Sequence, residues 1–193
     1  MNDLLDKFYE YKRISNYTIK YTLANGILIE FKLKQTDFPH LIGLHKLIDI
    51  PIIRQFNDVS NLTIGAKYIV QKIKQQRILN ESVVKNSIYY PTIRDRYMAF
   101  SRDNILSVTY TNAIINFNAS LIGSNLLSDY ILFEAKDSKF NHLCVAKDSR
   151  GRRYAESFFV NASNLYMRGQ NIVGISKIEI YDENGDVYLR DDL

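Results

Sequence analysis

The stretch YTIKYTLANGILIEFKL, residues 17–33, decides the fold class at the start of this chain. Residues 17–23 and 27–33 alternate between apolar and polar side chains and are rich in β-branched and aromatic types, which is typical of half-buried strands. Between them stand Asn25 and Gly26, a pair that favours a type I′ turn because both residues tolerate positive φ. The stretch therefore predicts a β-hairpin closed by a type I′ turn.

Four further strands are predicted in the last third of the chain. They are rich in β-branched and aromatic residues and cover 130–136, 142–147, 154–160 and 172–181. The segment Asp-Ser-Arg-Gly at 148–151 makes a turn between the middle two. A short edge strand at 187–190 follows the last turn.

Helices are predicted mainly between the hairpin and these strands. Apolar spacing and capping residues mark 2–13, 38–48, 66–77, a short helix that starts at 80, and 94–100. The second helix is capped at 36–37 and must end before Pro51. The segment 105–117 is compatible with a helix or a strand. The predicted class is α+β, with N-terminal helices and a hairpin followed by a mostly antiparallel sheet of four to five strands.

Length and composition indicate one domain over 1–193. The chain has 193 residues, of which 46% are apolar and 24% charged, so a core of normal size is available without a metal or disulfide. We expect an N-terminal helix and first strand over 1–26, a main body over 27–181, and an acidic tail with a short edge strand over 182–193.

The same composition makes a membrane partner unexpected, because no apolar run approaches the roughly 18 residues of a membrane span. The acidic residues near the start also argue against a signal peptide. Cys144 is the single cysteine, so neither an internal disulfide nor a cysteine-based zinc cluster is expected. The default compartment is the cytoplasm.

Charge is distributed unevenly along the chain. The net charge is +4, but residues 182–193 hold five acidic residues and one arginine. Without them the chain has 24 basic and 16 acidic residues, a net charge of +8. A basic body suits a phosphate polymer, because neutralising phosphates releases counterions, although ordinary surface charge is the simpler explanation.

The most unusual stretch is FPHLIGLHK, residues 38–46. On a helix His40 shares a face with Gly43, whereas His45 lies about 140° away, so the two histidines do not form a metal-binding pair. Gly43 costs about 1 kcal/mol inside a helix, which close packing of a strand or a ligand beside His40 would offset. His40 is either a hydrogen-bonded histidine at the edge of the core or a general base. His45 is expected at the surface near Asp49.

A second candidate site is the strand RRYAESFFV, residues 152–160. Period-two alternation places Arg153 and Ser157 on one face, where a guanidinium and a hydroxyl suit a phosphate. Arg152 and Tyr154 point the other way and are candidate nucleic-acid contacts. The alternative is an edge hairpin with solvated arginines.

A basic and aromatic segment at 94–97 is a candidate RNA contact. Arg94 and Arg96 would meet phosphates and Tyr97 would stack on a base, unless Asp95 neutralises the arginines. Gln170 is a further candidate polar contact. The chain has no phosphate-binding glycine loop, no HExxH, no GxSxG and no cysteine–histidine ligand spacing, so nucleotide triphosphate, zinc and serine hydrolysis lack support.

Four blocks in this order resemble one family: FPHLIGL at 38–44, DYILFE at 129–134, RRYAESFFV at 152–160 and YMRGQ at 166–170. They are similar to the phage-associated barnase/EndoU/colicin/RelE-like (BECR) nuclease domains, fourth subfamily, over about residues 27–181. The resemblance implies N-terminal helices with a four-stranded antiparallel sheet. It also implies RNA cleavage without metal or cofactor, in a phage, mobile-element or toxin setting.

Carried over by position, the resemblance makes His40, Lys46, Arg153 and Ser157 the catalytic residues. His40 would take the proton of a ribose 2′-hydroxyl, whose oxygen attacks the phosphorus. Arg153 and Lys46 would offset charge on the phosphoryl oxygens while Ser157 orients the phosphate. The products would be a 2′,3′-cyclic phosphate and a 5′-hydroxyl. His142 is on a strand where burial is expected, so the leaving group would be protonated by water or a tyrosine.

Two other functions stay open. The first is a catalytically inactive RNA-binding or protein-interaction module in a phage-conflict system, which would bind RNA in a salt-sensitive way without cleavage. The second is an inhibitor or regulator that docks on a phage-defence complex through 182–193. Under the nuclease hypothesis the expected partners are RNA, with transfer RNA as one candidate, and a protein antitoxin or immunity partner.

Overall fold

The computed structural model describes residues 3–57, 65–107, 110–136 and 138–192. Its α-helices are α1 (Leu4–Ile14), α2 (Phe38–Leu41), α3 (Pro51–Asn57), α4 (Ala66–Gln75), α5 (Glu81–Lys85), α6 (Tyr90–Ala99) and α7 (Arg102–Ile105). Its 3₁₀-helices are η1 (Gln35–Asp37), η2 (Leu44–Lys46), η3 (Ala119–Ile122) and η4 (Leu165–Met167). Its strands are β1 (Thr18–Leu23), β2 (Leu28–Lys32), β3 (Asn112–Ile115), β4 (Tyr130–Lys136), β5 (Lys139–Lys147), β6 (Arg153–Asn161), β7 (Asn171–Tyr181) and β8 (Val187–Asp192).

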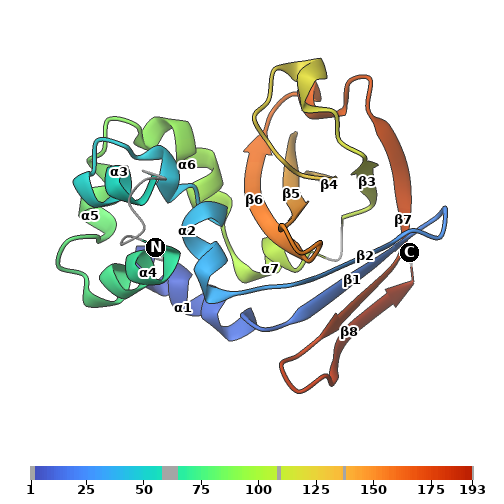
Figure 1. The fold of residues 1–193 in the computed structure, drawn as a ribbon, viewed down its shortest axis with the longest axis horizontal. Helices are drawn as coiled ribbons and strands as arrows, with labels where there is room; N and C mark the ends of the chain where they lie inside the picture. Colours follow the sequence, from blue (N-terminus) through green and yellow to red (C-terminus); the bar gives the residue numbers. More distant parts are fainter. Residues whose placement is uncertain (1–2, 58–64, 108–109, 137, 193) are drawn as a thin grey trace.

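The described strands form one antiparallel sheet in the order β2-β1-β7-β3-β4-β5-β6, with β8 also paired to β7. The sheet curls until β2 and β6 contact each other, so it is almost a closed cylinder (Figure 1). The predicted α+β class with an antiparallel sheet is confirmed, but the predicted size of four to five strands was wrong. The reason is that the hairpin of residues 17–33 pairs with β7 and thereby joins the same sheet.

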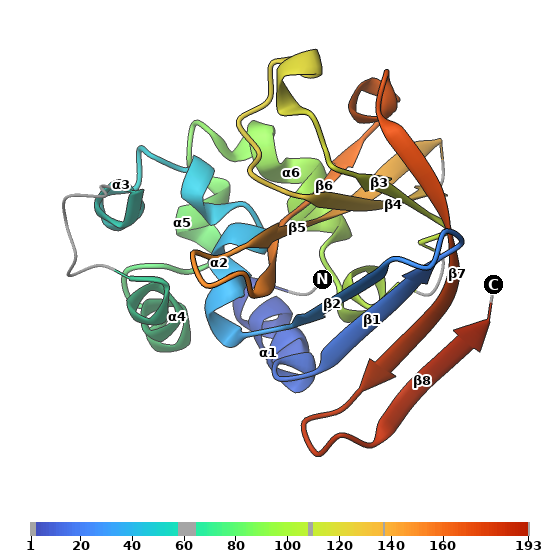
Figure 2. The same cartoon turned by 45° about the vertical axis from the view of Figure 1, so that its right-hand side comes forward.

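The helices gather on one side of the sheet, beside β6, and β8 projects from β7 on the other side (Figures 1 and 2). Phe38 of α2 packs edge-on against Phe8 and Phe100, with ring centroids 5.3 and 5.4 Å apart. Phe100 in turn contacts Phe158 of β6, at 6.1 Å. Because these rings are buried and bury a large apolar area, they hold α2 against β6. Several of the candidate site residues meet at this junction.

The hairpin of residues 17–33 is confirmed as β1 and β2, but its turn is not type I′. Only Gly26 has a positive φ, of 84°, and the Leu23 N–H pairs with the Ile27 carbonyl across a three-residue loop. The Asn25 side chain accepts a hydrogen bond from the Ile27 N–H at 3.2 Å. Asn25 thus acts through its side-chain oxygen rather than through tolerance of positive φ.

The predicted helix over 38–48 was wrong, because it is broken in the middle. α2 ends at Leu41, Gly43 has a φ of +90°, and the short η2 follows. A left-handed residue cannot continue an α-helix, so the chain changes direction at Gly43. The helix α3 starts at Pro51 and was not predicted, although proline suits the first position of a helix.

The other elements follow the predictions closely. The N-terminal helix begins after an Asp3 cap, while Asn2 lies outside the described residues. Helices α4, α5 and α6 match the predictions except that α6 starts four residues earlier, at Tyr90. The strands of the last third match within three residues at each end. In the ambiguous segment 105–117 the structure has strand β3, and the residues 108–109 lie outside the described part.

Among the described residues no helix combines the length and the apolar composition that crossing a membrane requires.

Candidate active site: a cleft between the helices and strand β6

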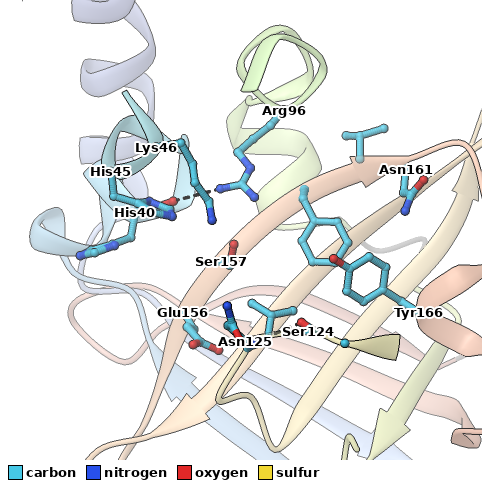
Figure 3. Close-up of a pocket in the computed structure, with 14 residues that line it drawn as sticks. His40, His45, Lys46, Arg96, Ser124, Asn125, Glu156, Ser157, Asn161 and Tyr166 are labelled. Carbon is cyan, nitrogen blue, oxygen red and sulfur yellow. Dashed lines mark hydrogen bonds between the residues drawn. The ribbon is translucent and has the colours of Figure 1, made fainter. Parts of the chain in front are cut away.

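A cleft of about 530 Å³ lies where η2 and α6 face strand β6. Side chains from both sides point into it (Figure 3). It is lined by His40, His45, Lys46, Arg96, Gly123, Ser124, Asn125, Leu126, Glu156, Ser157, Phe159, Val160, Asn161 and Tyr166. His40, Lys46 and Ser157, three of the four residues predicted as catalytic, and Arg96, predicted to bind nucleic acid, therefore share one cavity.

The break at Gly43 brings the two histidines of this segment together. The ring centroids of His40 and His45 are 5.1 Å apart, and the His40 ring also contacts Phe56 at 5.0 Å. The expectation that His45 lies about 140° from His40 at the surface was wrong, because it assumed a continuous helix. His45 is partly buried, and its Nδ1 has no hydrogen-bond partner in the described structure.

Both imidazoles are held in the neutral form at neutral pH. Desolvation lowers the pKa of His40, and the charge of Arg96 lowers it further. Desolvation, followed by the charges of His40 and Arg96, lowers the pKa of His45 to about 3. A neutral imidazole has a lone pair that accepts a proton, so His40 suits the role of a base.

Arg96 of α6 is the central cation of the cleft. Its Nη1 donates to the His40 carbonyl at 3.5 Å, and no carboxylate of the described residues lies within ion-pair distance of its guanidinium. Burial lowers the pKa of Arg96 to about 10, which still leaves it charged. Arg96 is half-buried at the wall of the cleft, so a cation without a counter-ion is presented there to an anionic ligand.

Gly43 makes room for this arginine. A Cβ atom at Gly43 would lie 2.9 Å from Cδ and 3.2 Å from Nη1 of Arg96, and 3.0 Å from Cγ2 of Ile93. The glycine is therefore needed both for the left-handed turn and for the close approach of Arg96. The expected close packing of a strand against Gly43 was wrong, because the side chains that approach it, Arg96 and Ile93, belong to helix α6.

A β-bulge in β6 decides which residues of that strand reach the cleft. The register shifts between Cys144 and Val145, so that Ser157 pairs with Cys144 but Ala155 pairs with Val145. Glu156 is the extra residue, and both Glu156 and Ser157 line the cleft. A bulge interrupts the alternation of faces, so residues on its two sides no longer follow period two.

Arg153 consequently lies on the other side of the bulge, outside the cleft. Its guanidinium stands over the Tyr130 ring at 5.1 Å and donates to the Tyr130 hydroxyl at 3.4 Å. Tyr130 belongs to the main core, whereas Phe159 beside Ser157 belongs to a separate cluster on the opposite face of the sheet. The prediction that Arg153 and Ser157 share a face was wrong, and Arg96 occupies the place expected for Arg153.

Glu156 was missed as a site residue, and it fixes one wall of the cleft. One carboxylate oxygen accepts from the Leu127 N–H at 3.1 Å, and the other accepts from the Ser128 hydroxyl. These bonds hold the segment 123–126 over the cleft. The block at 152–160 contains Glu156, but without a signal for the bulge, alternation placed it on the face away from Ser157.

The remaining predicted nucleic-acid contacts lie elsewhere. Arg152 pairs with Asp148 at 2.8 Å, and Arg94 is exposed and does not line the cleft. Gln170 has both ends of its amide bound to the backbone of Asn118, at 3.0 and 2.9 Å, which is a structural role. Tyr154 is half-buried on β6 and does not line the cleft.

The proposed base-stacking role of Tyr97 was wrong, because this ring is only 1% exposed. Its hydroxyl donates to Glu81 inside the helical layer. Asp95 forms its close ion pair with Lys139 at 2.9 Å, so it does not neutralise Arg96.

His142 is fully buried, as expected for its strand. It stacks on Phe159 with ring centroids 4.5 Å apart and an interplanar angle of 15°. Burial lowers the pKa of His142 to about 4, so its ring packs in the neutral form among the aromatic rings of the second cluster. Within the described ranges no group of three or more histidine, cysteine or carboxylate side chains gathers in a way that suits a metal ion.

No curated protein and no solved structure matches this chain. The family model for phage-Barnase-EndoU-ColicinE5/D-RelE like nuclease4 (PBECR4) matches residues 3–185, which confirms the resemblance predicted from the sequence, and the chain belongs to this nuclease family.

Proposed function

We propose that this protein is a metal-independent endoribonuclease that cleaves RNA by attack of a 2′-hydroxyl, leaving a 2′,3′-cyclic phosphate and a 5′-hydroxyl. The observation that carries the proposal is Arg96, whose guanidinium reaches into the cleft without a carboxylate partner among the described residues. A phosphate diester is the anion that a nuclease cleft receives, and membership of the family supports the nuclease class.

Three hydrogen-bond donors in the cleft, one of them Arg96, suit a phosphate. Figure 3 shows the ends of the Lys46 and Arg96 side chains, which come from η2 and α6 on the helical side, directed toward Ser157 of β6. The guanidinium offers a two-pronged donor, Lys46 adds a point charge at the mouth, and the Ser157 hydroxyl adds a neutral donor. Such preorganised donors stabilise the charge that develops on phosphoryl oxygens in the transition state.

His40 is the proposed base. Its lowered pKa keeps the ring neutral at pH 7, so it is ready to take the proton of the 2′-hydroxyl, whose oxygen then attacks the adjacent phosphorus. A bound phosphate counteracts the charge of Arg96 and raises the proton affinity of His40 at that moment. Glu156 is less suited to this role because both its oxygens already accept hydrogen bonds. The leaving 5′-oxygen takes its proton from water in the open cleft.

The family description begins with the word phage, which supports a role in phage or mobile-element conflict. In that setting a protein antitoxin or immunity partner would keep the nuclease inactive until it is released.

The test is cleavage of an end-labelled RNA in EDTA, with mass analysis of the new ends. We expect a 2′,3′-cyclic phosphate with the wild type and a loss of about 100-fold or more in His40→Ala and Arg96→Ala. Arg153→Ala is the matched arginine control, because Arg153 lies outside the cleft, and it should retain cleavage. Full activity in both cleft variants would refute the assignment. Salt-sensitive RNA binding without any cleavage by the wild type would leave a binding module instead.

A further inference from the structure

The cleft extends beyond the phosphate donors to a wall of different chemistry. Phe159 and Asn161 of β6 and Tyr166 of η4 line this end, and Figure 3 shows Tyr166 and Asn161 on the side of Ser157 away from His40. The mechanism proposed above uses none of these three side chains. Their position next to a phosphate site raises the question of what they would contact on a nucleic acid.

Strand β6 sets the spacing between the two ends. At about 3.3 Å per residue, Phe159 lies roughly 7 Å and Asn161 roughly 13 Å along the strand from Ser157. A ribose and its base extend over this range from a phosphate. A phosphate held at Ser157 therefore delivers the base of the same nucleotide to the aromatic wall.

The aromatic wall is rigid. The rings of Phe159 and Tyr166 are 4.5 Å apart, and Phe159 is stacked on the buried His142 ring behind it. Tyr166 also lies over Phe117, at 6.4 Å with an interplanar angle of 26°, and it stays partly exposed at the cleft. Aromatic rings on a fixed support are the usual stacking platform for an unpaired base.

The amide of Asn161 has a fixed orientation. Its Oδ1 accepts from the N–H of Ser163 at 3.0 Å and from the Ser163 hydroxyl at 3.3 Å. A backbone N–H only donates, so the oxygen must face Ser163 and the Nδ2 must face the other way. No described residue accepts a hydrogen bond from this Nδ2. The cleft end thus presents a hydrogen-bond donor whose polarity cannot be reversed by an amide flip.

We propose that this end of the cleft is a base subsite that selects keto bases, with the partly exposed Tyr166 ring, supported by the buried Phe159, as the stacking surface and Asn161 Nδ2 as the donor to the base carbonyl. Uracil and guanine carry a carbonyl acceptor, O4 or O6, where cytosine and adenine carry an amino donor. The fixed Asn161 donor can form a hydrogen bond with the carbonyl of uracil or guanine, whereas it faces another donor on cytosine or adenine. The inference rests on the proposed function, since it assumes that a nucleotide phosphate occupies the Arg96 site.

The experiment measures binding and cleavage separately. Binding of the 3′-monophosphates of uridine, guanosine, cytidine and adenosine is measured by calorimetry. Cleavage is measured on four DNA oligonucleotides, each of which contains a single ribonucleotide with a different base. We expect uridine and guanosine nucleotides to be favoured by roughly tenfold in both assays. Asn161→Asp keeps the oxygen that Ser163 needs but replaces the donor by an acceptor, so the preference should vanish or reverse. Asn184→Asp, in an exposed turn, is the matched control and should keep it.

The stacking wall has its own pair of variants. Tyr166→Phe keeps the ring and should bind all four nucleotides as the wild type does, whereas Tyr166→Leu should weaken all four by about tenfold. Equal binding of the four nucleotides, with Asn161→Asp indistinguishable from Asn184→Asp, would overturn the subsite even if RNA cleavage is confirmed. Keto-selective binding without cleavage would support the subsite and refute the nuclease. Absence of binding by all four nucleotides would overturn the subsite, while cleavage of long RNA by the same protein would leave the nuclease standing.

Discussion

Replacing Gly43 with alanine tests whether the break in the 38–46 segment builds the active cleft. Gly43 has a φ of +90° and contacts Arg96. Gly26, in the β1–β2 turn, has a φ of +84° with nothing within 4 Å of its Cβ position. The two glycines therefore share the backbone conformation and differ only in their neighbours, so Gly26→Ala is a matched control.

The expected destabilisation can be worked out from this difference. A left-handed backbone costs an L-residue about 1–2 kcal/mol, and this applies at both positions. At Gly43 the new Cβ would also stand 2.9 Å from Arg96 Cδ and 3.0 Å from Ile93 Cγ2, and overpacking of this kind adds about 1–3 kcal/mol. We expect the free energy of unfolding to fall by about 2–5 kcal/mol in Gly43→Ala and by about 1–2 kcal/mol in Gly26→Ala.

The assay is urea unfolding of both variants, followed by RNA cleavage at a temperature where each is fully folded. Because the Cβ pushes the Arg96 side chain from its position, Gly43→Ala should also lose cleavage, whereas Gly26→Ala should keep it. Equal losses of stability would show that Arg96 does not pack on Gly43. Wild-type cleavage by a folded Gly43→Ala would refute the view that this glycine positions the arginine.

Three further predictions concern stability and binding. Burial lowers the pKa of His142 to about 4, so the unfolded chain binds a proton at this histidine more tightly than the folded chain does. The free energy of unfolding is therefore highest above about pH 6.5, the pKa of an unfolded histidine, and should fall by about 2 kcal/mol as the pH is lowered to 5. Urea titrations at several pH values should show a smaller fall of the free energy of unfolding in His142→Phe. The part of the fall that comes from His45, whose pKa is also lowered, should remain. Gln170→Ala removes two hydrogen bonds to Asn118 and should cost about 1–2 kcal/mol, with faster amide exchange in the 118–126 segment. Arg96→Gln should reduce the slope of log affinity for RNA against log salt by about one, because one phosphate contact is lost.

Most of the secondary structure could be predicted because it follows from local patterns. The hairpin of residues 17–33 and the four strands of the last third have regular alternation, and α4 and α5 have clear apolar spacing or capping. The size of the sheet could not be predicted, because the pairing of β1 with β7 joins residues more than 150 positions apart. The alternation of apolar and polar residues in β1 or β7 does not indicate which other strand it pairs with.

The site could be predicted in part. His40, Lys46, Arg96 and Ser157 were all named as candidates, and the structure brings them to one cleft. Arg153 was placed there by alternation that the bulge interrupts. A bulge depends on how two strands pair, so one strand's sequence does not reveal it.

The cleft owes its composition to the two positions where regular structure fails. A continuous helix over 38–48 would turn His45 away from His40, and Gly43 prevents this by reversing the backbone and admitting Arg96. An unbroken β6 would place Arg153 beside Ser157, and the extra residue Glu156 prevents this instead. The difference matters for the proposed chemistry, because the guanidinium of Arg153 stands over the Tyr130 ring outside the cleft, whereas Arg96 lines the cleft together with His40 and Ser157. A phosphate bound in the cleft can reach only a cation that lines it, so the two irregularities together make Arg96 rather than Arg153 the arginine of the proposed site.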